Sequence, residues 1–313
     1  MLKFYKSVDN VVCEIDSWEV GCWINATEPE DAELEYLKNT LAIDAMFVNS
    51  ALDEEESSRT EISDAGDQIL IMVDVPYALR QGENSILYST MPLGVVVTKD
   101  NVVTISSKEN TVMKELTDSM VKNVNTQFKT RFLFVILYRI ALRFLQYLKQ
   151  IDRIETLLES ELRHSMQNKE LLQLLEIEKS LVYFSTSLKA NQMTIEKILR
   201  GRVLKIYEED QDLLEDVLIE IKQGVDMSNI YSGIVKTSMN SYSSVISNNL
   251  NSAMKFLTSI TILLAIPTLI SSFYGMNVEL PLNGKYAFWF LIVFSLCSTV
   301  GSFWILKRRD LLK

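Results

Sequence analysis

The sequence predicts an α/β domain, then long helices, and finally two transmembrane helices near the C-terminus. Three observations predict this order. Apolar, β-branched runs separated by turn residues fill the first part of the chain. Apolar residues then recur every three or four positions, without proline, from about residue 111 to 250, and two uncharged segments follow. We therefore expect an α/β domain (1–110), a helical hairpin region (111–200), a long stalk helix that continues into a first span (201–276) and a second span (286–306).

The α/β domain is expected to combine strands with two short helices. A helix should begin near residue 28, because Thr27 and Glu30 have the spacing of a capping box and Pro29 lies in the first turn. A second helix is expected at about 42–52. The runs that predict strands are 11–16, 21–26, 68–79, 86–91, 94–99 and 101–106.

The helical region is expected to break in two places. One is the stretch 165–169, and the other is Gly201, because glycine lowers helix stability. These breaks give a helical hairpin and then one stalk helix. The stalk is expected to start near residue 203 and to run directly into the first span.

Two uncharged segments predict transmembrane helices. Residues 256–278 contain no charged side chain, and at about 1.5 Å per residue this stretch reaches roughly 34 Å, enough to cross a bilayer core. We place the first span at about 253–275 and the second at 286–306. The external loop between them, 277–285, is too short to cross back, so the spans form a hairpin. The alternative is a pair of helices buried in a soluble core.

The charges beside the second span predict its orientation. Lys307, Arg308 and Arg309 follow that span directly, in a basic tail at 307–313. The positive-inside rule places this end in the cytoplasm, and an even number of spans places the α/β domain there as well. We expect a multi-pass protein of the cell (inner or plasma) membrane with both termini cytoplasmic and with lipid around the spans.

Composition disfavours several classes of function. The 313-residue chain has a formal net charge of −10, and residues 1–251 contain 25 basic and 39 acidic side chains. This acid excess disfavours a nucleic-acid partner. Three cysteines rule out a disulfide scaffold, and a single histidine disfavours a histidine-based metal site or catalytic triad. Because the sequence also lacks a P-loop, a nucleophile elbow and zinc-site spacing, we expect no enzyme.

The stalk and the first span share a polar or small face. At 100° per residue its members fall within about a 100° sector, although the span around them is apolar. Such a face is expensive against lipid, so it must contact protein or water. One interpretation is a helix-packing face; the other is the lining of a pore built by several copies. The stripe consists of Asn240, Ser243, Ser247, Asn251, Met254, Thr258, Thr261, Ala265, Thr268 and Ser272.

A four-residue motif, Tyr274-Gly275-Met276-Asn277, closes the first span at its outer end. With this placement, and with the upstream sequence SNNLNSAMKFLTSITILLAIPTLISSFYGMN, the chain resembles the CorA magnesium transporters, a two-span class. The upstream match includes the mid-span proline, Pro267. The layout of the whole chain, from the α/β domain to the C-terminal hairpin, also resembles that family.

The resemblance implies a homopentameric channel with one first span from each subunit around its axis. Gly275, Met276 and Asn277 would form the selectivity filter, where neutral oxygens accept hydrogen bonds from the water shell of Mg²⁺. Leu257 matches a leucine that narrows the family's pore and gates it by dewetting. Other matched positions lie along the stripe: Asn251 and Thr268 stand at family pore positions, whereas Ala265 replaces a common methionine and Asn240 an acidic residue.

The resemblance also implies gating by cytoplasmic Mg²⁺ bound between subunits. Asp216 matches one carboxylate of the family's regulatory site. The family's partner carboxylate is replaced here by Ser50, and nearby Asp53 and Glu54 are its possible substitutes. Mg²⁺ is thus expected as the transported ion and as a regulatory ion.

The function expected from all this is Mg²⁺ influx down the electrochemical gradient, with hydrated divalent cations and further copies of the chain as partners. One alternative is a transporter of the same build for Zn²⁺, Co²⁺ or Ni²⁺. A second is a membrane-tethered coiled-coil or sensor protein that transports nothing.

Overall fold

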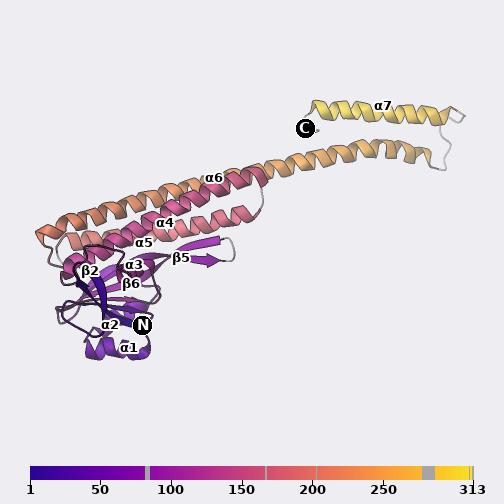
Figure 1. Ribbon diagram of the computed structural model, residues 1–313. Helices are drawn as coiled ribbons and strands as arrows, with labels where there is room; N and C mark the ends of the chain where they lie inside the picture. Colours follow the sequence, from indigo (N-terminus) through magenta and orange to yellow (C-terminus); the bar gives the residue numbers. More distant parts are fainter. Residues whose placement is uncertain (82–84, 166–167, 202, 277–285, 310, 312–313) are drawn as a thin grey trace. The chain divides into compact units, whose positions relative to one another are not determined.

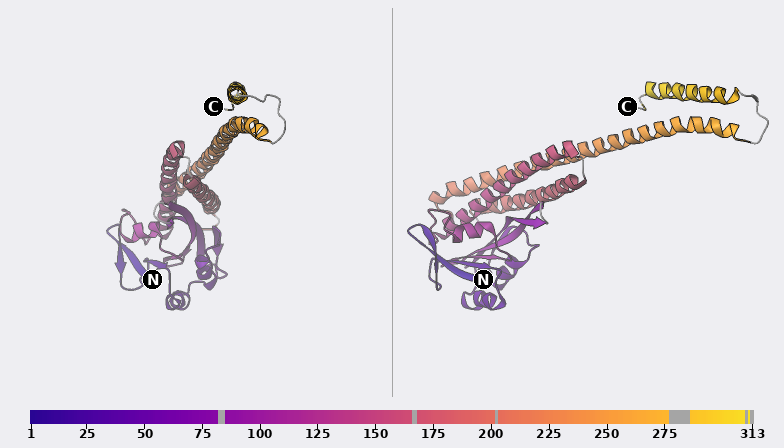
Figure 2. Two further views of the ribbon diagram at one scale, coloured as in Figure 1. Left: turned by 90° about the vertical axis from the view of Figure 1, so that its right-hand side faces the viewer. Right: turned by 45° about the vertical axis from the view of Figure 1, so that its right-hand side comes forward.

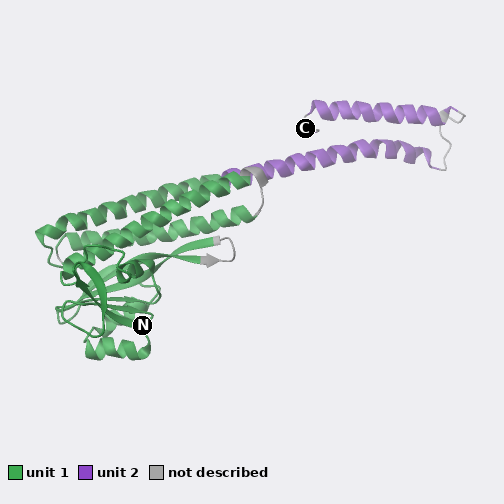
Figure 3. Cartoon of the chain, viewed as in Figure 1, with its two compact units in different colours: residues 1–238 green, residues 239–313 purple. Residues whose placement is uncertain are grey.

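The structure is a computed structural model that describes residues 1–81, 85–165, 168–201, 203–276, 286–309 and 311. Its internal contacts divide the chain into two compact units, Met1–Ser238 and Met239–Lys313 (Figure 3). The first unit contains the α/β domain and a group of long helices, and the second contains the apolar helices.

A mixed seven-stranded sheet organises the first unit, in the order β2-β1-β3-β7-β6-β5-β4. Strands β3 and β7 are parallel, with Trp23 opposite Val102, and the other neighbouring strands are antiparallel. The strands are β1 (Leu2–Val8), β2 (Val11–Ile15), β3 (Trp23–Thr27), β4 (Arg59–Ile62), β5 (Ile69–Gln81), β6 (Ser85–Val97) and β7 (Val102–Ser106).

The sheet differs from the sequence-based expectation in two respects. Strands β1 and β4 were not expected, and the runs 86–91 and 94–99 form the single strand β6 instead of two. Strand β7 pairs with β6 only along Gly94–Val97. Pro92 of β6 lies before this paired stretch, so its missing N–H removes no hydrogen bond between β6 and β7. A Cβ atom on Gly94 would lie 2.5 Å from the Ala51 Cβ, so glycine is required there by packing against a helix.

One face of the sheet is covered by α1 (Asp31–Glu35), the π-helix η1 (Tyr36–Thr40) and α2 (Ala45–Leu52). The expected helix start near residue 28 was wrong. Glu30 is the N-cap and forms a capping box with Glu33, whereas Thr27 ends β3 and Glu28 has a φ of +47°. Thr27 and Glu30 have the spacing of a capping box in the sequence, but Thr27 cannot be the N-cap because it is the last residue of strand β3.

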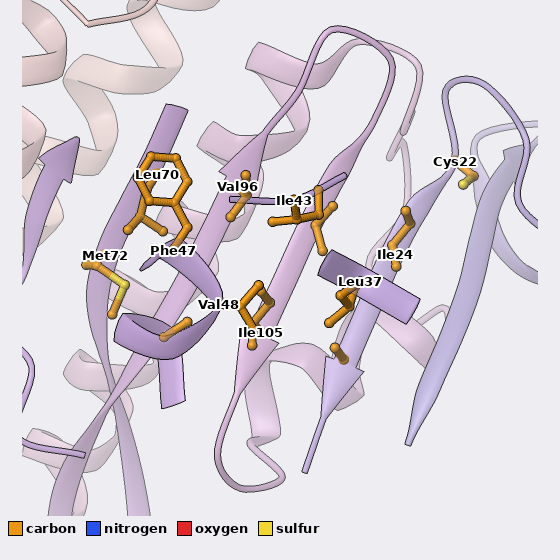
Figure 4. Packing of buried hydrophobic residues seen from close by; sticks show 13 residues of the cluster. Cys22, Ile24, Leu37, Ile43, Phe47, Val48, Leu70, Met72, Val96 and Ile105 are labelled. Carbon is orange, nitrogen blue, oxygen red and sulfur yellow. The ribbon is translucent and has the colours of Figure 1, made fainter. Parts of the chain in front are cut away.

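The core on this face lies between the sheet and α2 (Figure 4). Phe47 and Val48 of α2 pack with Leu70 and Met72 of β5 in one cluster. All four side chains are almost completely buried. Burial of large aliphatic and aromatic side chains is the main stabilising contribution to such a domain.

Helices α4 (Lys129–Ser165) and α5 (Asn168–Leu199) cover the opposite face of the sheet (Figures 1 and 2). The ring of Phe132 in α4 lies 5.4 Å from that of Trp23, and the ring of Phe184 in α5 lies 6.2 Å from that of Tyr88. The remaining helices of this region are the short α3 (Thr111–Thr117) and α6 (Glu208–Tyr274).

The helix breaks were partly anticipated. Helix α4 ends at Ser165 and α5 begins at Asn168, as expected, and Gly201 has a φ of +68° before α6 begins. The helical region does not run unbroken from residue 111, however. Helix α3 stops at Thr117, and Ser119 and Asn123 adopt positive φ values that interrupt the helix.

The second unit is an antiparallel pair formed by the C-terminal part of α6 and by α7 (Ala287–Arg308) (Figure 1). Both helices contain stretches long and apolar enough to cross a membrane. Only 6% of each stretch is buried within the chain, which does not fit core helices of a soluble protein. Helix α6 continues without interruption from the first unit to Tyr274, as expected for a stalk that runs into a span.

Candidate functional site

The polar stripe of α6 is exposed along its whole length within one chain. The part before the apolar segment presents amides and hydroxyls, and the part inside it presents threonines, an alanine and a serine. Leu257, on the same side of the helix, is 66% exposed. The exposed stripe residues are Asn240, Ser243, Ser247, Asn251, Met254, Thr258, Thr261, Ala265, Thr268 and Ser272.

A shallow groove of about 650 Å³ follows the outer half of this stripe. Four stripe residues supply its polar or small part: Thr261, Ala265, Thr268 and Ser272. Leu264, Leu269, Phe273 and Met276 supply its apolar edges. The groove is open to the surroundings of the single chain, so nothing within this unit fills it.

Helix α7 covers a different face of α6. A cavity of about 620 Å³ lies between the two helices, and on the α6 side Pro267, Ile270, Ser271 and Tyr274 line it. At 100° per residue these positions are centred nearly opposite the groove. The stripe is therefore not the surface that packs on α7, and its small residues do not serve the hairpin contact.

The hydroxyls of the stripe have a defined orientation. The Thr261 Oγ1 donates to the carbonyl of Leu257 at 2.9 Å, and the Thr268 Oγ1 donates to the carbonyl of Leu264 at 2.9 Å. Each proton is directed along the helix to the preceding turn, which leaves the oxygen lone pairs free to accept. The stripe therefore presents neutral acceptor oxygens.

The end of the first span tightens at the four-residue motif. The Gly275 N–H lies 3.0 Å from the Ser271 carbonyl and 3.2 Å from that of Ser272, so the last turn is narrower than a regular α-helix. Met276 is 53% exposed and lines the groove. Asn277 and the loop 277–285 lie outside the described residues.

The expected regulatory carboxylates lie in the first unit. Asp216 is exposed on α6, and Asp53 is exposed at the end of α2, where its Oδ1 accepts from the Glu55 N–H at 3.0 Å. Glu54 already pairs with Lys108 at 2.6 Å. The Ser50 Oγ accepts a hydrogen bond from the Arg59 Nη2 at 3.2 Å.

The described carboxylates do not gather into a metal-binding cluster. Across the described residues, no three His, Cys, Asp or Glu side chains form a group that can hold a metal ion, and Asp216 is part of no such group.

Sequence reasoning missed the burial of several carboxyl groups in the first unit, among them Glu155, which is 7% exposed, and Asp74, which is partly buried. Burial raises the pKa of Asp74, and a hydrogen bond with Ser187 opposes that rise. Burial likewise raises the pKa of Glu155 on α4, whose Oε1 accepts from Ser238 at 3.3 Å. The local sequence did hold a signal for both residues: Asp74 interrupts the apolar run 68–79, and Glu155 falls between Ile151 and Leu158 at the helical spacing of a buried face.

A C-terminal pair of membrane-crossing helices, joined by one continuous helix to an α/β domain and carrying an exposed polar stripe, defines a class of membrane transport protein. The chain matches the CorA-like Mg²⁺ transporter protein family over residues 18–308, and it belongs to that family. As a member, it is a divalent cation transporter and a membrane protein, not an enzyme.

Individual proteins agree with this assignment. The chain is 28% identical over 298 residues to the cobalt/magnesium transport protein CorA of Methanocaldococcus jannaschii, covering 91% of this chain and 90% of that one. The complete structure of the CorA magnesium transporter from the same organism matches with a TM-score of 0.81, 26% identity and 98% coverage of both chains. The full-length CmaX structure shares the fold, with a TM-score of 0.70 at 13% identity, 98% of this chain and 97% of that one being covered.

Proposed function

We propose that this chain forms a homopentameric channel that carries hydrated Mg²⁺ into the cell, with the stripe of α6 from each subunit facing the axis. The observation that carries the proposal is the placement of the stripe: it is exposed along its length, and α7 lies against another face of the helix. Polar side chains in a membrane require protein or water beside them, and several copies around an axis provide both.

The chemistry of the stripe suits a hydrated dication. Mg²⁺ holds its water tightly, and metal-bound water donates hydrogen bonds outward. Thr261 and Thr268 offer lone pairs to such water because their own protons are bound to backbone carbonyls. Neutral acceptors attract the ion without holding it as long as a carboxylate ring would.

The filter is proposed at the outer end of the span. Rings of Gly275 carbonyls and Asn277 side-chain oxygens would accept from the outer water shell, with Met276 beside them. Support comes from the position of Gly275 at the end of α6 and from the resemblance of the motif to that of the family. The proposed gate is a ring of Leu257 side chains, which excludes water when the ring is narrow.

The membrane potential supplies the driving force. A unit charge gains about 2.3 kcal/mol per 100 mV, so a dication gains about 4.6 kcal/mol on entering a cell at that potential. An opposing tenfold concentration ratio costs only about 1.4 kcal/mol. Influx therefore needs no ATP, provided that the basic tail and the first unit lie in the cytoplasm, as the positive-inside rule predicts.

Gating is proposed to depend on cytoplasmic Mg²⁺ bound between subunits by Asp216 and Asp53. Asp53 is favoured over Glu54 as the partner because Glu54 already forms an ion pair with Lys108. A bridging cation would relieve repulsion between acidic subunits and hold the ring closed.

The experiment that tests this function is a flux measurement on the purified protein in liposomes at a defined membrane potential. We expect Mg²⁺ entry that rises with inside-negative voltage, with Co²⁺ as a competing ion. Flux of Zn²⁺ or Ni²⁺ that persists in excess Mg²⁺, without Mg²⁺ flux, would assign the chain to another metal. Absence of any divalent flux, together with a monomeric protein, would instead indicate a tethered, non-transporting role.

A further inference from the structure

The buried side chains described in the second unit lie at the base of the hairpin. Among the side chains whose burial is described for residues 253–276 and 286–309, two are buried: Ser259, which is 1% exposed, and Leu306, which is 8% exposed. The buried Ser259 hydroxyl has a hydrogen-bond partner within α6 and a second one in the segment after α7.

Leu311, in the segment after α7, is bonded to both helices. The Leu311 N–H donates to the carbonyl of Leu306 at 3.1 Å, which ties it to the end of α7. The Leu311 carbonyl lies 2.9 Å from the Ser259 Oγ, which ties it to α6. The same hydroxyl is 2.8 Å from the carbonyl of Lys255, so its proton is shared between an acceptor in its own helix and one outside it. We call Ser259, Leu306 and Leu311 the C-terminal anchor.

The C-terminal anchor lies beside the residue proposed as the gate. Ser259 is two residues beyond Leu257, and at 100° per residue it lies about 160° from Thr261, on the face covered by α7. Farther along the helices, a cavity of about 620 Å³ lies between α6 and α7. The attachment at the base, nearer to Leu257, is therefore a direct tie between the turn that carries Leu257 and the end of α7.

We propose that the Ser259–Leu311 hydrogen bond fixes the turn that carries Leu257 and thereby limits ion leak through the closed pore. This inference rests on the proposed function. Ser259 is a positioning residue: it holds the helix from behind and faces away from the ion path. Without the bond, the turn has one fewer attachment to α7, and the ring of Leu257 side chains closes less completely.

The test compares Ser259→Ala with a matched control, Ser271→Ala, in the full-length protein. The Ser271 hydroxyl also donates to the carbonyl four residues earlier, that of Pro267, at 2.9 Å, but its described bond stays within α6. Two quantities are measured: deuterium exchange in the peptide spanning residues 306–313, and Mg²⁺ leak into liposomes when the cytoplasmic side holds inhibitory Mg²⁺.

Loss of one hydrogen bond worth about 1 kcal/mol should raise both quantities about five-fold in Ser259→Ala and neither in Ser271→Ala. A chain ending at residue 310 should behave like Ser259→Ala, and combining the two changes should add nothing further. Unchanged exchange in Ser259→Ala would overturn the anchor itself. Raised exchange with unchanged leak would overturn its effect on the gate.

The two measurements, deuterium exchange and Mg²⁺ leak, also distinguish a failure of this inference from a failure of the proposed function. A wild-type protein without divalent flux would refute the channel, whereas the exchange measurement would still decide whether Ser259 holds the segment after α7.

Discussion

Thr268 and Ile270 are two residues apart on α6 and open into different spaces. Thr268 lines the groove of the exposed stripe, and Ile270 lines the cavity shared with α7. The two faces of this apolar helix thus differ in their surroundings. The face that carries Ile270 lies toward α7, and the face that carries Thr268 presents acceptor oxygens that no described residue of α7 covers.

The acceptor oxygen of Thr268 should matter for ion passage. Thr268→Val keeps the shape of the side chain but removes the lone pairs that accept from hydrated Mg²⁺. We expect Mg²⁺ flux to fall at least about five-fold, because each subunit loses one acceptor and a single lost hydrogen bond of about 1 kcal/mol already corresponds to that factor. Thr299→Val on α7 is the control, because Thr299 makes the same bond to the carbonyl four residues earlier, at 2.8 Å, but lines the cavity between the helices. Equal effects of both variants would argue against a special role for the stripe.

The proposed filter makes a stronger prediction. In the proposed pentamer, Asn277→Ala would remove all the side-chain oxygens that residue 277 offers to the hydrated ion, so Mg²⁺ uptake should be abolished. The oligomer should remain intact, as judged by its size in detergent. Flux at the wild-type level would remove Asn277 from the filter.

Regulation can be tested on the stalk. Asp216→Ala should shift the internal Mg²⁺ concentration for half-inhibition several-fold upward, because one ligand of the proposed intersubunit site is lost. Asp212→Ala, an equally exposed carboxylate one turn earlier on α6, serves as the control and should leave the inhibition curve in place. An inhibition curve that Asp216→Ala does not move would exclude this residue from the site.

The first unit should show a pH dependence that originates at Asp74. Burial raises the pKa of this carboxyl above its ordinary value of 3.8, so folding favours the protonated form. The protonated carboxyl therefore contributes its full share to the free energy of unfolding below pH 3.8. This contribution is lost as the pH rises through the higher pKa of the folded state.

Asp74→Asn should therefore raise the melting temperature of the full-length protein near pH 7 by a few degrees, and the gain should shrink toward pH 4. The exposed Asp64→Asn is the control. A destabilised Asp74→Asn protein at neutral pH would mean that the hydrogen bond with Ser187 outweighs burial.

The sequence was most informative where one periodicity persisted over many residues. The spans, the continuous α6 and the break after Ser165 all follow from long apolar patterns with clear interruptions. Short elements were less predictable: β4 has only four residues, Arg59–Ile62, and its pattern is too brief to distinguish from a loop. Helix α3 ends at Thr117, and the chain then takes positive φ values at Ser119 and Asn123. The sequence has no proline or glycine there that would predict the end of a helix.

The candidate site divides in the same way. The stripe could be predicted because its helical period is visible in the sequence. Its separation from the α7 face could not, since that depends on which side of α6 the second helix approaches. The contact between Ser259 and Leu311 was also hidden, because it joins residues 52 positions apart through a backbone carbonyl.

The central claim is tested most directly by comparing water access at the two faces of α6. In a background with Cys13, Cys22 and Cys297 replaced, Thr268→Cys and Ile270→Cys are treated with a charged, membrane-impermeant thiol reagent while Mg²⁺ flux into liposomes is recorded. We predict rapid reaction and loss of flux for Thr268→Cys, and neither for Ile270→Cys. Reaction at Ile270→Cys with Thr268→Cys untouched would contradict the assignment of the stripe to the ion path.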